Sequence, residues 1–150
     1  MCSYCGCESE TVIAELMADH EGIALLARAA NTALAGGDVV GAVSACREIA
    51  AIFDHHGAKE EAGLFAEWQA ERLDADVTAR LEADHRRLEL GLAQMAAGDT
   101  SHLDQVLADL LEHAGREDTD LFPAALALLP NDAWSRIRKV HDHLGSSPSL

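Results

Sequence analysis

The stretch HGAKEEAGLF at residues 56–65 returns later in the chain as HAGREDTDLF at residues 113–122. In both copies a glutamate follows a histidine four residues later, as His56 and Glu60 and as His113 and Glu117. On a helix, residues at this spacing project from one face with Cβ atoms about 5–6 Å apart. Each pair could therefore bind one metal ion or bridge two, so the chain carries a duplicated metal-ligand motif.

A second repeated segment precedes each copy of this motif. LMADHEGIAL at residues 16–25 aligns with LEADHRRLEL at residues 81–90, which sets Asp19-His20 against Asp84-His85. The repeat unit is thus one histidine followed by a His-x-x-x-Glu pair. Two units supply four imidazoles and two carboxylates.

Composition limits the class of protein. At 150 residues the chain fits one domain with a single core. Acidic residues outnumber basic ones 26 to 11, for a formal charge of −15, and such a field repels phosphate, so we expect neither nucleic acid nor an anionic membrane as a partner. The sequence has no apolar run near the roughly 18 residues of a membrane span and no signal-peptide pattern at its N-terminus. We therefore expect a cytoplasmic protein.

Apolar residues recur at helical spacing, and strand signals are absent. We expect helices over about 9–36, 38–72, 74–98 and 101–122, followed by a short helix from 131. Their expected N-caps are Ser9, Asp38, Asp74, Ser101 and Asn131. The pattern predicts an all-α, up-down-up-down four-helix bundle with a short C-terminal fifth helix. We divide the chain into a Cys-rich tail (1–8), the bundle (9–145) and a flexible C-terminus (146–150).

The repeated histidines and glutamates fall on the apolar sides of these helices. One hairpin carries His20, His56 and Glu60, and the other carries His85, His113 and Glu117. A glutamate in an apolar core is costly unless it is paired or binds a cation. Four-helix bundles with inward Glu and His bind two iron or manganese ions, and this mixture of donors suits iron best, although zinc is chemically acceptable.

As a set, these motifs resemble the hemerythrin-like proteins of the HHE cation-binding group. The resemblance runs from about Thr11 to His143 and includes Leu64-Phe65 and Leu121-Phe122-Pro123 after the two glutamates. It implies two iron ions joined by an oxo or hydroxo bridge. The resemblance assigns His20 and His56 to one iron, His85 and His113 to the other, and Glu60 and Glu117 to both.

The chain departs from the oxygen-carrying members of that group at two positions. They have a fifth histidine one turn after the third-helix histidine, where this chain has Glu89. Their fourth-helix carboxylate corresponds to Asp118, but the spacing of His56 and Glu60 favours Glu117. We interpret Glu89 and Asp118 as solvated surface acids, either of which could be recruited as an extra ligand.

With only five ligands, each iron would keep an open position, which favours redox turnover over reversible oxygen carriage. The first hypothesis is therefore a di-iron protein that reacts with hydrogen peroxide or dioxygen, like a catalase or peroxidase, in oxidative-stress defence. The alternative is a module that binds or senses dioxygen, nitric oxide or iron without turnover. The sequence leaves a monomer and a homodimer both open.

Three thiols, Cys2, Cys5 and Cys7, gather at the N-terminus. They could bind Cu(I) or Zn(II) or act as a redox switch, and a further hypothesis is a copper or zinc protein that uses both the tail and the bundle. The plainer interpretation is a terminal segment without a specific role. We interpret Cys46 as a buried hydrophobe. The remaining histidines are expected at the surface or its boundary and the tryptophans in packing at the bundle ends: His55, His102, His141, His143, Trp68 and Trp134.

Overall fold

The computed structural model describes residues 7–146, without the side chain of Cys7, so the three tail thiols lie outside the described residues. All the elements in the described range are helical. In chain order they are α1 (Cys7–Ala35), α2 (Val39–Lys59), η1 (Glu60–Phe65), α3 (Ala66–Ala70), α4 (Ala75–Ala96), α5 (Leu103–Arg116), η2 (Glu117–Leu121), α6 (Phe122–Leu128) and α7 (Asn131–Leu144).

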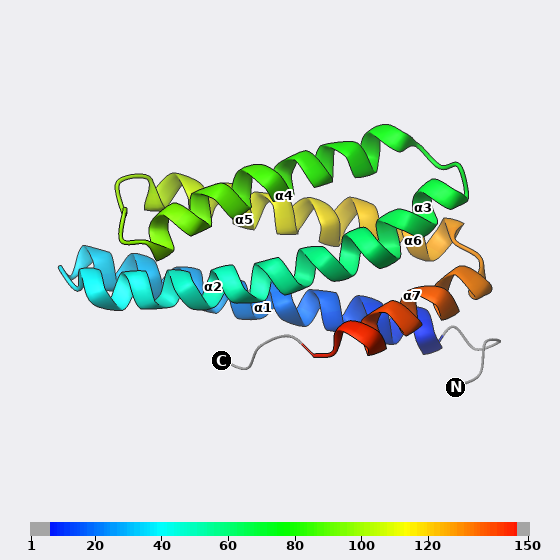
Figure 1. The fold of residues 1–150 in the computed structure, drawn as a ribbon, viewed down its shortest axis with the longest axis horizontal. Helices are drawn as coiled ribbons and strands as arrows, with labels where there is room; N and C mark the ends of the chain where they lie inside the picture. The colour runs from blue at the N-terminus through cyan, green and yellow to red at the C-terminus, as the bar shows by residue number, and fades with distance from the viewer. Residues whose placement is uncertain (1–6, 147–150) are drawn as a thin grey trace.

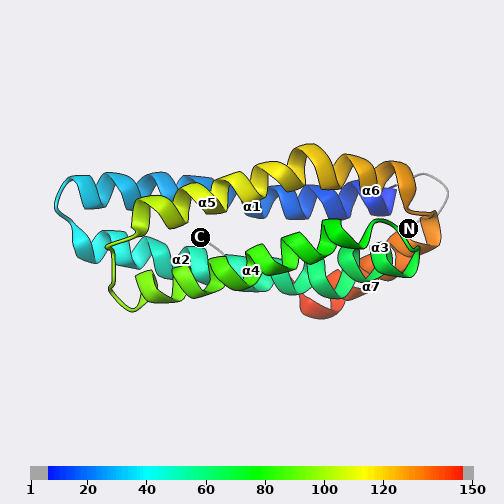
Figure 2. The ribbon, with the colours of Figure 1, turned by 90° about the horizontal axis from the view of Figure 1, so that it is seen from above.

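These elements form four long helical runs and one added helix. The second run joins α2, η1 and α3 end to end, and the fourth joins α5, η2 and α6. Figure 1 shows each run antiparallel to the run that follows it in the sequence. Helix α7 turns back and packs along the N-terminal end of α1. Figure 2 shows the same bundle from above, with α4 and α5 side by side. The predicted all-α bundle with a short fifth helix is confirmed.

Side-chain N-caps confirm two of the predicted helix starts. The Asp38 carboxylate accepts a hydrogen bond from the Gly41 N–H at 2.8 Å, and the Asp74 carboxylate accepts one from the Asp76 N–H at 3.0 Å. These bonds satisfy N–H groups that have no partner within the helix. Gly37 follows the end of α1 with a φ of 81°, a conformation that glycine adopts without strain.

Three other predicted caps are wrong. Ser9 lies inside α1, because this helix already begins at Cys7. Ser101 donates its hydroxyl to Asp99 in the preceding turn, so α5 begins at Leu103 without a side-chain cap. Asn131 is the first residue of α7 rather than its cap.

Two apolar clusters fill the bundle, one on each side of a polar layer. The first includes Ile49, Phe53 and Leu92, and the second includes Phe65, Phe122 and Trp134. Burying one large apolar side chain stabilises the fold by about 1.5–3 kcal/mol. Two such clusters can therefore hold a polar layer between them that contributes little stability of its own.

The predictions for cysteine and tryptophan packing are confirmed. Cys46 is fully buried in the first cluster, and this burial raises the pKa of its thiol. Trp68 and Trp134 both belong to the second cluster, and the Trp68 indole N–H donates to the Asp74 carbonyl at 2.9 Å.

The two π-helical segments were not predicted. Each begins at the glutamate of a His-x-x-x-Glu pair, Glu60 in η1 and Glu117 in η2. A π-turn contains an extra residue, which rotates the side chains that follow it, and such turns are frequent at functional sites. The Thr119 hydroxyl in η2 donates to the Gly115 carbonyl in the last turn of α5 at 2.8 Å.

A membrane span would need a longer and more apolar helix than any found in the described part of the chain.

Candidate metal centre

The polar layer brings together all six residues that the repeat singles out. Each offers one ligand atom, and these atoms form two groups, within each of which they lie no more than 4.8 Å from one another. All six side chains are buried. The first group is His20, His56, Glu60 and Glu117, and the second is Glu60, His85, His113 and Glu117. The two glutamates are common to both groups.

Glu60 reaches one histidine of each group. Its Oε1 lies 3.1 Å from His56 Nε2, and its Oε2 lies 3.2 Å from His85 Nε2. These histidines come from α2 and α4, on different hairpins of the bundle. The carboxylate therefore spans the space between the two groups, with one oxygen directed to each.

Glu117 does the same from η2. Its Oε2 lies 3.6 Å from the Nε2 atoms of both His20 and His56. Its Oε1 contacts His113 Nε2 and lies 3.8 Å from His85 Nε2. Both carboxylates therefore direct one oxygen to each of the two histidine groups.

The inner atoms have few partners of their own. Within residues 7–146, both oxygens of Glu60, both oxygens of Glu117, and the Nε2 atoms of His85 and His113 are buried without a hydrogen bond. Leaving such atoms unsatisfied costs about 1–3 kcal/mol each, and more when they are charged. Imidazole nitrogens and carboxylate oxygens are ligands of iron and zinc. The donor set therefore fits metal ions.

An outer carboxylate contacts the Nδ1 atom of each of the four histidines. The Nδ1–oxygen distances are 2.8 Å for His20 with Asp118, 3.2 Å for His56 with Asp19, 2.9 Å for His85 with Glu61 and 3.4 Å for His113 with Asp84. We call Asp19, Glu61, Asp84 and Asp118 the orienting carboxylates. Such a partner holds the proton on Nδ1 and directs the Nε2 lone pair to a metal.

The orienting carboxylates occupy equivalent positions in the two halves of the repeat. Asp19 and Asp84 each contact a histidine of their own hairpin. Glu61 and Asp118 directly follow the two inner glutamates, and each contacts a histidine of the opposite hairpin. These two cross-contacts tie the halves of the site together.

The interpretation of Asp118 as a solvated surface acid is wrong. Its side chain is 30 % exposed and accepts a hydrogen bond from His20. Glu89, also interpreted as a solvated surface acid, is 31 % exposed, lies outside both ligand groups and pairs with Arg86 at 3.3 Å. Sequence reasoning did not identify any orienting carboxylate, although their repeat-related positions beside the ligand motifs were a usable signal.

The histidines and glutamates form a charged cluster in the absence of metal. Burial opposes the protonation of His85, but the nearby carboxylates of Glu117 and Glu60 outweigh it and raise the pKa of His85 to about 10. Burial would raise the pKa of Glu117, yet interactions with Glu60 and His113 hold it well below its usual value. A metal ion that binds here must therefore displace protons from imidazoles.

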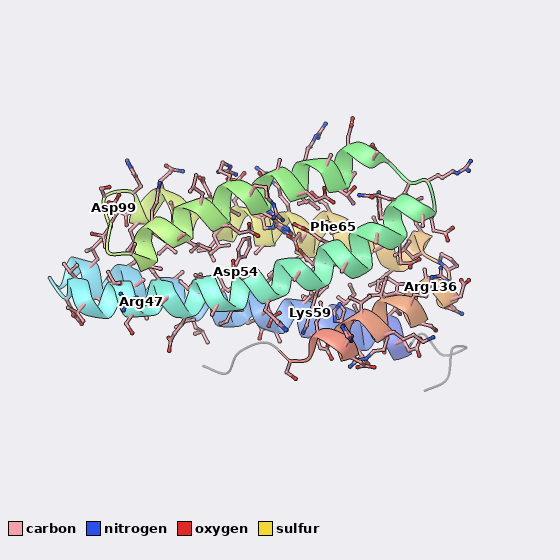
Figure 3. All side chains as sticks on the ribbon, in the orientation of Figure 1. Arg47, Asp54, Lys59, Phe65, Asp99 and Arg136 are labelled. Atoms are coloured by element: carbon pink, nitrogen blue, oxygen red, sulfur yellow. The ribbon has the colours of Figure 1, made fainter. Side chains whose placement is uncertain are left out.

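Aromatic rings enclose the site. The edge of Phe53 meets His85 and His113 at centroid distances of 5.5 and 6.0 Å. From the other cluster, Phe65 stacks on His85 at 5.6 Å and Phe122 stacks on His20 at 5.8 Å. Figure 3 shows Phe65 beside the nitrogen atoms gathered in the middle of the bundle. These rings limit the access of water to the inner ligand atoms.

Among the remaining histidines, the prediction for His141 is wrong. This residue of α7 is 1 % exposed, and its Nδ1 lies 3.0 Å from Glu15 Oε2 on α1. His102 and His143 are exposed and His55 is half-buried, as expected. Cys46 belongs to neither ligand group, and the three tail thiols lie outside what the structure describes.

Comparison with known families agrees with this geometry. The profile of the Hemerythrin HHE cation binding domain matches residues 11–125. This range contains all six inner residues and the four orienting carboxylates, and it ends before α7. No curated protein and no solved structure gives a match. Because the matched range covers most of the chain, the protein belongs to the hemerythrin family of HHE cation-binding domains.

Proposed function

We propose that the protein binds two iron ions, joined by an oxo or hydroxo bridge, at the six inner residues. The family and the two buried His/Glu groups indicate a metal-binding protein, typically of iron. The observation that carries the proposal for a pair of ions is that Glu60 and Glu117 each direct one oxygen to either histidine group. The proposed ligands are His20 and His56 for one ion, His85 and His113 for the other, and Glu60 and Glu117 for both.

The charge around the site supports two ions rather than one. Two inner carboxylates are buried beside imidazoles that become neutral once the metal has displaced their protons. Four orienting carboxylates stand behind the imidazoles, and arginines pair with two of them, Glu61 and Asp84. Buried charges need compensation by opposite charges nearby. A pair of divalent or trivalent cations offsets this group better than a single ion.

We further propose that the centre reacts with hydrogen peroxide or dioxygen, like a catalase or peroxidase, in oxidative-stress defence. Iron would supply Lewis-acid and redox chemistry when bound. The chain's own contribution is to orient four imidazoles through their Nδ1–H groups, to span both ions with two carboxylates, and to exclude bulk water with three phenylalanines. The pairing of Glu89 with Arg86 supports an open position, because Glu89 stands where a fifth ligand would be.

A second candidate is a module that binds or senses dioxygen, nitric oxide or iron without turnover. Its support is the aromatic enclosure by Phe53, Phe65 and Phe122, which suits a small uncharged ligand held away from water. The hypothesis of a copper or zinc protein that uses the tail stays a prediction, because the tail thiols lie outside the described residues and the described ligand groups contain no thiol.

Metal analysis with an absorption spectrum tests the iron proposal. Protein purified without added metal should contain about two irons per chain and show near-ultraviolet oxo-to-iron absorption. Glu60→Ala should lose iron, whereas Glu89→Ala should keep it because Glu89 lies outside the ligand groups. Copper or zinc in place of iron, or equal iron in both variants, would contradict the proposed centre.

Oxygen evolution from added hydrogen peroxide then separates the two candidate functions. Iron-loaded protein should evolve oxygen if turnover is its function. Stable, reversible oxygenation with negligible peroxide turnover would favour the binding module.

A further inference from the structure

Within the described range α7 has no repeat counterpart, although the four helical runs form two repeat-related hairpins. It packs on α1 and η1, where Ile137 approaches so closely that a Cβ atom at Gly63 would lie 3.3 Å from its side chain. Trp134 and Ile137 also belong to the second apolar cluster. We call the face of α1 and η1 beneath α7 the covered face. Figure 1 shows α7 along the lower side of the bundle and α4 along the upper side.

Polar contacts with Glu15 hold α7 on the covered face. The Oε1 atom of Glu15 lies 2.8 Å from Arg138 Nη1, and its Oε2 atom lies 3.0 Å from His141 Nδ1. Arg138 and His141 are three residues apart and therefore share a face of α7. Beside Gly63 the helix presents Val140, whose side chain lies 3.7 Å from where a Cβ atom would be. The covered face thus pairs one carboxylate with two basic residues and offers a glycine for close approach.

A groove of about 440 Å³ opens on the other hairpin, between α4 and the α5–η2 segment. We call it the α4–η2 groove. When the two repeat alignments are continued at the same register, its lining residues are the counterparts of residues on the covered face. The pairs are Val77 with Val12, Arg80 with Glu15, Leu81 with Leu16, Arg116 with Lys59, Asp120 with Gly63 and Leu121 with Leu64. The α4–η2 groove is therefore the vacant equivalent of the face that α7 covers.

The exposure of the paired residues agrees with one covered and one vacant face. Lys59 is 2 % exposed, whereas the side chain of Arg116 is 52 % exposed. Gly63 is buried and Asp120 is exposed. Leu81 and Leu121 are buried at the bottom of the groove. The groove therefore has an apolar floor and a charged rim, which is the pattern of a site for an amphipathic helix.

The charges that line the groove balance, because two arginines face two aspartates. Two of them are already paired: Arg116 contacts Glu112 and lies 3.5 Å from Asp84. Arg80 forms no ion pair with another residue in the range 7–146. Asp120 accepts a hydrogen bond from the hydroxyl of its neighbour Thr119 at 3.3 Å. The charges left for an incoming helix are therefore those of Arg80 and Asp120.

These two charges determine which helix fits. Arg80 stands where Glu15 pairs with Arg138 and His141, so a helix in the groove needs acidic residues at those two positions. Asp120 stands where Gly63 meets Val140, so a basic residue is needed there. Helix α7 of a second copy would instead direct two basic residues at Arg80. Like charges that meet at an interface exclude a partner.

We propose that the α4–η2 groove is a docking site for an amphipathic helix of a partner protein. The helix packs apolar side chains on Leu81 and Leu121, pairs two acidic residues three positions apart with Arg80, and sets a basic residue against Asp120. A helix in this position lies over Asp84, which contacts His113, so docking takes place directly beside the polar layer. The inference concerns the surface of the bundle and does not require bound metal.

A synthetic peptide derived from α7 serves as the probe. The exchanged peptide consists of residues 131–144 with Arg138→Glu, Val140→Lys and His141→Glu, so it combines the apolar face of α7 with the charges that the groove requires. In ¹⁵N-labelled, metal-free, full-length protein it should shift the amide resonances of α4 and η2 and leave those of α1 and η1 in place. The NMR titration also gives its dissociation constant.

A matched peptide controls for net charge. It carries Arg136→Glu, Val140→Lys and His143→Glu, which place the two glutamates at positions that are exposed on α7. This peptide should bind about tenfold more weakly than the exchanged peptide, because its glutamates point away from Arg80. Equal affinities of the two peptides would overturn the proposed recognition.

The variant Arg80→Glu should reverse the preference of the groove. It restores the acidic residue that α1 has at the equivalent position, so the exchanged peptide should bind about tenfold more weakly and the unchanged α7 peptide more tightly. Arg28→Glu changes the net charge equally at an exposed position of α1 and should alter neither affinity. Arg80→Gln, which only removes the charge, should give a smaller loss.

Two results of these titrations would contradict the docking site. One is equal affinity of the exchanged peptide for the Arg80→Glu and Arg28→Glu proteins. The other is a set of shifts confined to α1 and η1, which would mean that the peptide displaces α7 from the covered face. Loss of iron from the purified protein would contradict the proposed function alone, because the titrations use metal-free protein.

Sedimentation velocity of the protein without peptide tests a second copy as the occupant. A monomer, or a dimer that both Arg80→Glu and Arg28→Glu retain, agrees with a groove that is free for a partner helix. A dimer that Arg80→Glu dissociates and Arg28→Glu does not would assign the groove to a second copy of this chain. That result would refute the partner helix.

Discussion

Glu61 lies 2.9 Å from His85 Nδ1, although the two residues belong to opposite halves of the duplicated chain. Its repeat counterpart Asp118 makes the reciprocal contact with His20. Each hairpin therefore supplies a carboxylate that orients a histidine of the other. The centre cannot be divided into one site for each hairpin, because both ligation and orientation cross between them.

Removal of a cross-hairpin carboxylate should weaken metal binding. We expect Glu61→Ala and Asp118→Ala each to lower metal affinity by about 10–100-fold, because the affected imidazole loses the partner that fixes its tautomer and ring orientation. Competition titration with a chelator would measure this change. Glu48→Ala, which removes an exposed carboxylate of α2, should have no effect, and equal affinities in all three variants would contradict the orienting role.

The stability of the metal-free protein should fall as pH rises above neutrality. The pKa of His85 is raised from 6.5 to about 10, so its contribution is complete below pH 6.5 and is lost as pH rises towards 10. The pKa values of His20 and His56 are raised as well, which acts in the same direction. The pKa of Glu117 is lowered from 4.5, so its contribution is present above pH 4.5 and is lost on further acidification. The free energy of unfolding of the metal-free protein is therefore expected to be largest between about pH 4.5 and 6.5.

Bound metal should reverse this trend, because metal competes with protons for the same nitrogens. Thermal unfolding at pH 6 and pH 9, with chelator and with excess metal, would test both statements. The increase in Tm produced by metal should be larger at pH 9. A metal-free Tm that rises from pH 6 to pH 9 would contradict the protonated cluster.

Glu89→His should slow peroxide turnover in iron-loaded protein. The substitution offers an additional imidazole one turn after His85 on α4, which would close an open position if the new ring leaves Arg86. Turnover measured as oxygen evolution should fall in this variant but not in Gln94→His, which adds an imidazole at an exposed position of the same helix. Unchanged turnover in both would show that open coordination is not the cause of the activity.

Deletion of residues 1–7 should leave the iron content unchanged. The six inner ligands come from four helical runs that start at or after α1, so a complete ligand set remains without the tail thiols. Iron analysis and the absorption spectrum of the truncated protein would test this expectation. Loss of metal would assign Cys2, Cys5 or Cys7 to the site and favour mixed thiolate ligation.

The sequence by itself determined the helices, the duplication and the six inner residues. These features depend on local rules: a histidine and a glutamate four apart share a helix face, and Asp38 and Asp74 cap the helices that follow them. The motifs also carried the resemblance to the hemerythrin family, which the match over residues 11–125 then showed. None of these inferences needs the angle or distance between two helices.

Only the tertiary structure decided how those residues face one another. The contact of Glu61 with His85, the role of Asp118 and the burial of His141 against Glu15 depend on how helices far apart in the sequence pack and rotate. The π-turns that begin at Glu60 and Glu117 also change the direction of the side chains that follow them, and no residue pattern in the sequence predicted these turns. The physical reason is that helical periodicity determines which face of its own helix a side chain occupies. The packing of the two hairpins determines which side chains meet between helices.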